Sequence, residues 1–106
     1  MRGLAVGALA GLALAGCSQG PALSDAAARG QTVYLAQCTA CHATDPAQPG
    51  PLGPPVKGAS RELLEARLLR GDYPPGYTPK RDSTLMQPMP QLAPSIPDLA
   101  AFLADQ

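Results

Sequence analysis

The chain has 106 residues, which is enough for one small domain and excludes a large hydrophobic core. Its eight Lys and Arg balance eight Asp and Glu, so it lacks the basic excess of nucleic-acid binders, and we expect no nucleic-acid partner. Thirteen prolines and eleven glycines, with one Phe and no Trp, indicate a chain that is poor in core-forming side chains. Such small domains commonly need a bound non-protein group, and we expect one in the interior.

The N-terminus has the pattern of an export signal. Met1 and Arg2 give a positive start, and residues 3–15 are an uncharged run of Gly, Ala, Leu and Val. This run is shorter than the roughly 20 apolar residues that span a hydrocarbon core. The pattern therefore predicts a secretory signal and not a permanent transmembrane helix.

The run Leu-Ala-Gly-Cys that ends at Cys17 resembles the bacterial lipobox, in which cleavage precedes a cysteine that carries a diacylglyceryl group. We therefore predict a lipoprotein signal peptide at residues 1–16, a lipidated Cys17 with a tether over residues 17–23, and one domain over residues 24–106. Cleavage there would leave seven basic and eight acidic side chains. The alternative is an ordinary signal peptide with a coincidental cysteine.

The first helix is expected over residues 26–37, where Val33, Tyr34 and several alanines have helical spacing. Ser24 is the predicted N-cap, and Asp25 lies in the first turn, where a negative charge is favourable.

The motif Cys38-Thr-Ala-Cys41-His42 follows this helix directly and matches the haem-attachment pattern C-x-x-C-H. Two residues between the thiols bring both sulfurs to one side of a helical turn, where they can react with the two vinyl groups of one porphyrin. His42 can then reach the iron from the same side. One covalent haem c is the expected cofactor.

Three other uses of these cysteines fit the sequence less well. A zinc site needs at least three protein ligands, but His42 is the only histidine and Cys17 lies beyond the tether. A thioredoxin-like redox pair needs an α/β sheet, and no alternating strand pattern is present. A disulfide between Cys38 and Cys41 would close a loop too small to support so poor a core.

The rest of the chain predicts two irregular segments and two helices. Proline and glycine exclude regular structure from residues 45–58. A second helix is expected over residues 61–70, capped by Ser60 and stopped by Gly71; its Arg61, Glu62, Glu65 and Arg67 are expected to form a solvated face.

Residues 72–94 form the second long irregular segment, and wrapping a cofactor would account for its length. Ser95 is the predicted N-cap of the last helix, whose apolar stripe consists of Ile96, Leu99, Phe102 and Leu103.

With these helices and motifs the chain resembles the class I c-type cytochromes. Gly30, Tyr34 and Cys38 are spaced like the family's small residue, aromatic and first haem cysteine, and Leu99 and Phe102 look like its C-terminal leucine and aromatic. The resemblance implies an all-α fold, with three main helices and long Pro- and Gly-rich loops around one covalent haem. It also implies that the first and last helices cross at Gly30.

The segment Gly53-Pro54-Pro55-Val56 resembles the family's Gly-Pro-x-Leu loop, with Val56 in place of leucine. The resemblance implies that the carbonyl of Pro54 accepts the Nδ1 hydrogen of His42 and raises the basicity of its ring. Pro54 and Val56 are therefore predicted to contact the cofactor.

The sixth iron ligand is predicted to be a methionine, because the chain has no second histidine. Met89 with Pro90 looks like the family's Met-Pro motif, and Met89 is our first choice. Met86 is the alternative, because its separation from Leu99 is the more usual one; an open site is a third possibility. The methionine that is not a ligand is expected to pack against the haem.

Two groups of side chains in the irregular segments are not predicted to bind the iron. Tyr73 and Tyr77 are expected either to hydrogen-bond the haem propionates or to pack their rings. Lys57, Lys80 and Arg81 are expected to be solvated, with contact to an acidic partner or to the haem propionates as the alternative.

The sequence thus predicts a single-electron carrier without enzyme activity of its own, exported and held at the membrane by its acyl anchor. Its partners are expected to be redox proteins at the membrane, and no small-molecule substrate is expected. One alternative is a five-coordinate haem that binds or senses a ligand. The other is a fixed electron-transfer subunit of a dehydrogenase or oxidase.

Overall fold

The computed structural model describes residues 3, 7, 11 and 22–104. This part of the chain is all-α and contains no strand, as the sequence predicts. None of the helices in it is long and apolar enough to cross a membrane. Most of the predicted signal peptide (residues 1–16), Cys17 and most of the tether (residues 17–23) lie outside the described residues.

Helix α1 (Asp25–Gln37) begins and ends where its sequence predicts. The Ser24 hydroxyl accepts a hydrogen bond from the backbone N–H of Ala27 at 3.1 Å, which satisfies one of the free donors of the first turn. At the other end the N–H of Cys38 donates to the carbonyl of Tyr34 at 2.9 Å. The haem motif therefore continues directly from the last turn of α1.

The second predicted helix is divided into helix α2 (Arg61–Glu65) and the π-helical segment η1 (Ala66–Arg70). Its ends are as predicted, because the Ser60 hydroxyl accepts from the N–H of Leu63 and Gly71 adopts a left-handed conformation with φ 68°. The change to π geometry was not predicted. It matters because such wide turns are frequent at functional sites.

The last helix begins differently from the prediction. A 3₁₀ segment, η2 (Pro90–Ser95), leads directly into α3 (Ile96–Leu103). Ser95 has helical dihedral angles and its side chain makes no capping hydrogen bond, so its predicted N-cap role is wrong. The 3₁₀ turn already supplies the start of the helix, and the N–H of Ile96 donates to the carbonyl of Ala93.

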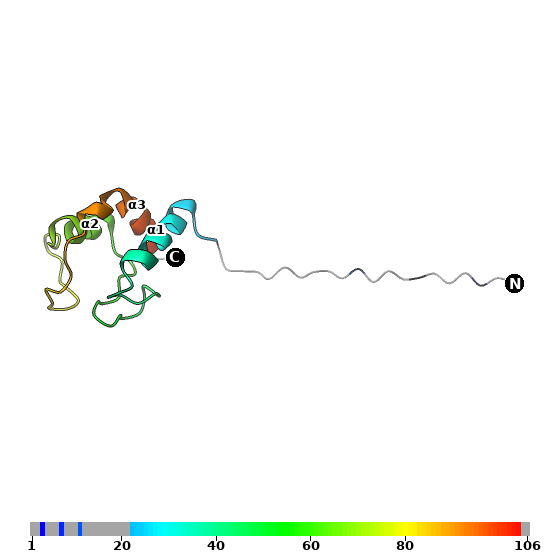
Figure 1. The fold of residues 1–106 in the computed structure, drawn as a ribbon, viewed down its shortest axis with the longest axis horizontal. Coiled ribbons are helices and arrows are strands. Elements are labelled where there is room, and N and C mark those ends of the chain that lie inside the picture. Colours follow the sequence, from blue (N-terminus) through cyan, green and yellow to red (C-terminus); the bar gives the residue numbers. More distant parts are fainter. Residues whose placement is uncertain (1–2, 4–6, 8–10, 12–21, 105–106) are drawn as a thin grey trace.

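Helices α1 and α3 cross in direct backbone contact at Gly30, as Figure 1 shows for the two elements. A Cβ atom on Gly30 would lie 2.0 Å from the backbone oxygen of Asp98. Beside the crossing, the rings of Tyr34 and Phe102 are 5.4 Å apart, and Arg29 forms a two-pronged ion pair with Asp98, with both contacts at 3.0 Å. The predicted crossing is confirmed.

The core is built around this crossing and reaches η1. Its buried members are Tyr34, Leu68, Leu92, Ile96, Leu99 and Leu103. Two irregular segments hang from the same side of the helices in Figure 1. We call residues 43–59 the proline loop and residues 71–89 the strap.

Substituting Gly30 by alanine tests the crossing. The added methyl group would collide with the α3 backbone, so we expect Gly30→Ala to lower the free energy of unfolding by about 1–3 kcal/mol. Helix propensity alone would favour alanine by about 1 kcal/mol. Urea unfolding followed by circular dichroism measures the difference, with Gln31→Ala on the exposed face of α1 as the control. A Gly30→Ala protein as stable as the parent would contradict the crossing.

Candidate functional site

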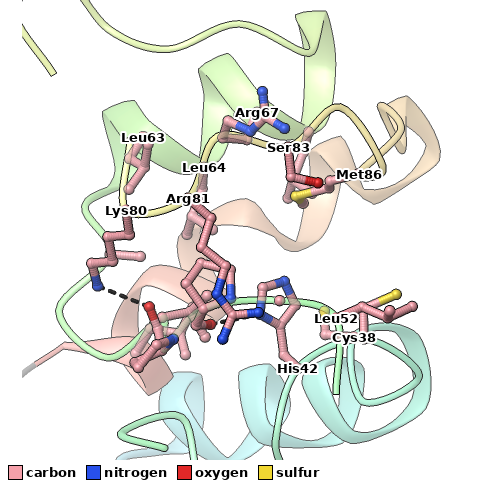
Figure 2. Close-up of a pocket in the computed structure, with 18 of the residues that line it drawn as sticks. Cys38, His42, Leu52, Leu63, Leu64, Arg67, Lys80, Arg81, Ser83 and Met86 are labelled. Carbon is pink, nitrogen blue, oxygen red and sulfur yellow. Dashed lines mark hydrogen bonds between the residues drawn. The ribbon is translucent and has the colours of Figure 1, made fainter. Parts of the chain in front are cut away.

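A large cleft lies between the proline loop and the strap, with the helices as its floor (Figure 2). Its empty space is about 1130 Å³, including the part open to solvent. Leu68, Leu99 and Leu103 belong to both the core and the cleft wall. The other aliphatic lining residues, prolines and methionine apart, are Leu52, Val56, Ala59, Leu63, Leu64 and Leu85. The cleft can therefore enclose a large, mainly apolar molecule.

Cys38, Cys41 and His42 all line this cleft. They share one turn, in which the N–H groups of Cys41 and His42 donate to the carbonyl of Cys38 at 3.3 and 2.9 Å. Both cysteines are free thiols; Cys38 is half-buried and Cys41 is exposed. Burial and the neighbouring Cys41 raise the pKa of the Cys38 thiol to about 11. The turn thus presents two thiols and an imidazole to one cavity.

The proline loop fixes the orientation of the His42 ring. Nδ1 of His42 lies 2.9 Å from the carbonyl oxygen of Pro54. Because a carbonyl oxygen can only accept, Nδ1 carries the hydrogen and Nε2 keeps its lone pair for a metal. The N–H of Gly53 donates to the carbonyl of Cys41 at 2.8 Å, which holds the loop against the ring.

Tyr34 secures the chain on the other side of the histidine. Its ring is buried in the core, and its hydroxyl donates to the carbonyl of Ala43, the residue after His42. Burial is the main cause that raises the pKa of the Tyr34 hydroxyl to about 12. The hydroxyl therefore remains a neutral donor throughout the physiological pH range.

The structure separates the two candidate methionines. Met86 lies in the strap, lines the cleft and is 37% exposed. Figure 2 shows it across the cleft from His42. Met89 is not among the lining residues; it packs against the core, and its N–H donates to the carbonyl of Leu68 at 2.7 Å.

A physical reason accounts for this difference. Leu68 lies in the last turn of η1, where backbone carbonyls lack partners within the helix. The N–H of Met89 satisfies one of them and draws the strap back to the helix. Met86 therefore lines the cleft and Met89 does not, while the choice between them as an iron ligand stays a prediction.

Arg67 does not belong to a solvated charged face, and that part of the prediction is wrong. Its guanidinium donates to the carbonyl of Gly71 at 2.8 Å and lies 4.3 Å above the centre of the Tyr73 ring. The Tyr73 and Tyr77 rings stack in turn, 5.4 Å apart. This column of three side chains braces the first half of the strap. Arg61 and Glu65 do form the expected exposed ion pair.

The charged residues at the cleft are all basic. Arg67, Lys80 and Arg81 line it, and no Asp or Glu is among the lining residues in the part of the chain that the structure describes. Lys80 is exposed, as expected, and in addition donates to the carbonyl of Pro55 at 2.8 Å. The cleft is therefore suited to an apolar molecule that carries negative groups.

The other readings of the cysteines find no support in this geometry. No group of three or more His, Cys, Asp or Glu within residues 22–104 is placed to hold a metal ion, as a zinc site would require. The described chain also lacks the sheet on which a thioredoxin-like pair would be built.

Comparison with known families gives one match. The family model described as Cytochrome c matches residues 27–106, which is most of the chain and includes every residue of the cleft. No curated protein and no solved structure matches the chain.

The contact between Gly53 and the histidine can be tested. A Cβ atom on Gly53 would lie 2.4 Å from Cε1 of His42, so Gly53→Ala must displace either the ring or the loop. We expect a loss of about 1–3 kcal/mol in the free energy of unfolding and faster exchange of the His42 Nδ1 hydrogen. Urea unfolding and proton NMR measure the two effects. Pro51→Ala, at an exposed position of the same loop, is the control. Parent-like stability and exchange would show that the close contact is absent.

Proposed function

Because the chain belongs to the cytochrome c family, we propose that it is a class I, monohaem electron carrier held at a membrane by a lipid anchor. The family binds haem c covalently and uses it to transfer electrons to and from redox proteins. In our proposal Cys38 and Cys41 would hold the haem covalently, and His42 and Met86 would be the protein ligands of its iron.

The turn that carries Cys38, Cys41 and His42 is the observation on which the proposal rests. Two thiols and an imidazole face one apolar cleft, and the Nδ1 contact with Pro54 leaves Nε2 of the imidazole free for iron. The basic residues of the cleft suit the two carboxylates of a haem. The residues present therefore fit this cofactor.

Each group in the site has a role in this proposal. The haem supplies the one-electron redox couple. Each cysteine would hold the haem through one thioether, with its S–H added across a vinyl group so that the sulfur is on one carbon and the hydrogen on the other. The carbonyl of Pro54 holds the His42 ring in one orientation and increases its donor strength. The leucines of the cleft exclude water from the cofactor.

Met86 is proposed as the sixth ligand for two reasons. It lines the cleft from the side opposite His42, whereas the backbone of Met89 is bound to η1. Met86 also has the more usual separation from Leu99. A thioether favours ferrous iron and raises the reduction potential relative to a second histidine. With both His42 and Met86 as ligands, little in the protein would need to move during electron transfer.

Paired substitutions of the methionines test this assignment. We expect Met86→Ala to abolish the weak far-red absorption band of Met-sulfur bonded to ferric iron and to allow carbon monoxide to bind the reduced protein. Met89→Ala is the matched control and should keep the band, while losing about 2 kcal/mol or more of stability from its packing against the core. Loss of the band only in Met89→Ala would restore the first choice. A parent protein that lacks the band and binds carbon monoxide would indicate a ligand-binding haem.

The membrane location is proposed from the sequence of the N-terminus. Cytochrome c domains typically function outside the cytoplasm, which agrees with an export signal at residues 1–16. A diacylglyceryl group on Cys17 would provide the two acyl chains that stable anchoring needs. Its redox partners would then be proteins of the same membrane or soluble proteins that visit its surface.

Substitution of Cys17 tests the anchor. We expect Cys17→Ser to abolish lipid attachment, so that the haem-containing protein no longer sediments with membranes. Cell fractionation, with haem staining of membrane and soluble fractions, measures this. The parent protein, washed in high salt, is the control for electrostatic adsorption. A Cys17→Ser protein that remains with the membrane would contradict the lipid anchor.

A further inference from the structure

Two consecutive carbonyl groups of the proline loop bind the two sides of the cleft. The carbonyl of Pro54 lies 2.9 Å from Nδ1 of His42, and that of Pro55 accepts a hydrogen bond from Nζ of Lys80 at 2.8 Å. Figure 2 shows Lys80 reaching down from the strap with this bond as a dashed line. The same short turn therefore contacts both the histidine and the segment that carries Met86.

The rest of the strap is attached elsewhere. Its first half is braced on η1 by Arg67, through the Gly71 carbonyl and the Tyr73 ring. Its end is fixed by the bond from the N–H of Met89 to Leu68. Along the chain, Lys80 lies between these two attachments: it follows the half that Arg67 braces and precedes Met86. Its bond to Pro55 crosses from the strap to the proline loop.

We propose that Lys80 is a positioning residue, which ties the strap bearing Met86 to the turn that orients His42 and so holds the two axial ligands as one unit. This inference rests on the proposed ligation by His42 and Met86. When Lys80 is released, the strap opens more often and Met86 leaves the iron. The turn at Pro54 and Pro55 then loses its outer support, and the hydrogen bond to His42 opens more often as well.

The expected effect is modest, because Lys80 is exposed and water competes for its ammonium group. A hydrogen bond from a charged donor at a protein surface shifts an opening equilibrium by roughly fivefold. A change of this size is measurable by a ligand that binds only to the open form, since the apparent affinity of such a ligand follows the open fraction.

Free imidazole is a suitable probe, because it takes the sixth position only after Met86 has left. We expect Lys80→Met, which keeps the aliphatic stem and removes the donor, to bind imidazole roughly fivefold more tightly than the parent in absorption titrations of the ferric protein. Lys80→Arg, which can donate to the same carbonyl, should restore parent affinity. Arg70→Met, which removes an exposed cation of η1, should leave the affinity unchanged.

A second measurement tests the link to the histidine. We expect the Nδ1 hydrogen of His42 to exchange faster in Lys80→Met than in the parent or in Lys80→Arg, by NMR of the ferrous protein without imidazole. Unchanged imidazole affinity in Lys80→Met would overturn the tie between strap and loop. Tighter imidazole binding with unchanged Nδ1 exchange would overturn the coupling of the two ligands.

The outcome for Met86 separates this inference from the proposed function. If Met86→Ala keeps the far-red band, the assumed ligand is wrong and the proposed ligation fails. If Met86→Ala loses the band while Lys80→Met behaves like the parent toward imidazole, the ligation stands and the role of Lys80 is wrong.

Discussion

The backbone contact between α1 and α3 at Gly30 is the constraint on which the site depends. Tyr34 and Cys38 follow Gly30 at intervals of four residues, so they lie along the same face of the chain as it leaves the crossing. The contact between Gly30 and Asp98 therefore sets the distance between the haem motif and Leu99, which belongs to the floor of the cleft. A side chain at the crossing would separate the helices and widen the cleft that the motif faces.

Backbone carbonyls organise the two irregular segments, because the chain has few large side chains with which to pack them. The carbonyls of Cys41, Ala43 and Pro54 hold the proline loop and the histidine, and those of Pro55 and Leu68 hold the strap. Proline contributes in a second way, since it limits the conformations of the unfolded chain and lowers the entropy lost on ordering. Segments without regular structure can in this way be as well defined as the helices.

Patterns that depend on local chemistry were sufficient to predict the helices and the haem motif. Ser24 and Ser60 cap helices because their hydroxyls accept hydrogen bonds from the backbone N–H groups three residues later. The spacing of Gly30 and Tyr34 predicted the crossing of the helices. The same local patterns did not predict contacts between segments that are distant in the sequence. The local pair Met-Pro favoured Met89, whereas in the structure the N–H of Met89 bonds to the carbonyl of Leu68 near the end of η1 and Met86 lines the cleft. The separation from Leu99 favoured Met86, which lines the cleft, and the identity of the ligand stays a prediction.

The π-helical turn of η1 explains why the strap can serve as one side of the site. Just after this segment the N–H of Asp72 bonds to the carbonyl of Ala66, two residues further back than in an α-helix, which leaves the carbonyl of Leu68 to accept from Met89. The same turn directs Arg67 toward the start of the strap, where it covers Tyr73. One irregularity in the helix thus anchors both ends of the strap. Because η1 also supplies Leu68 to the core, movement of the strap is limited by the packing of the core itself.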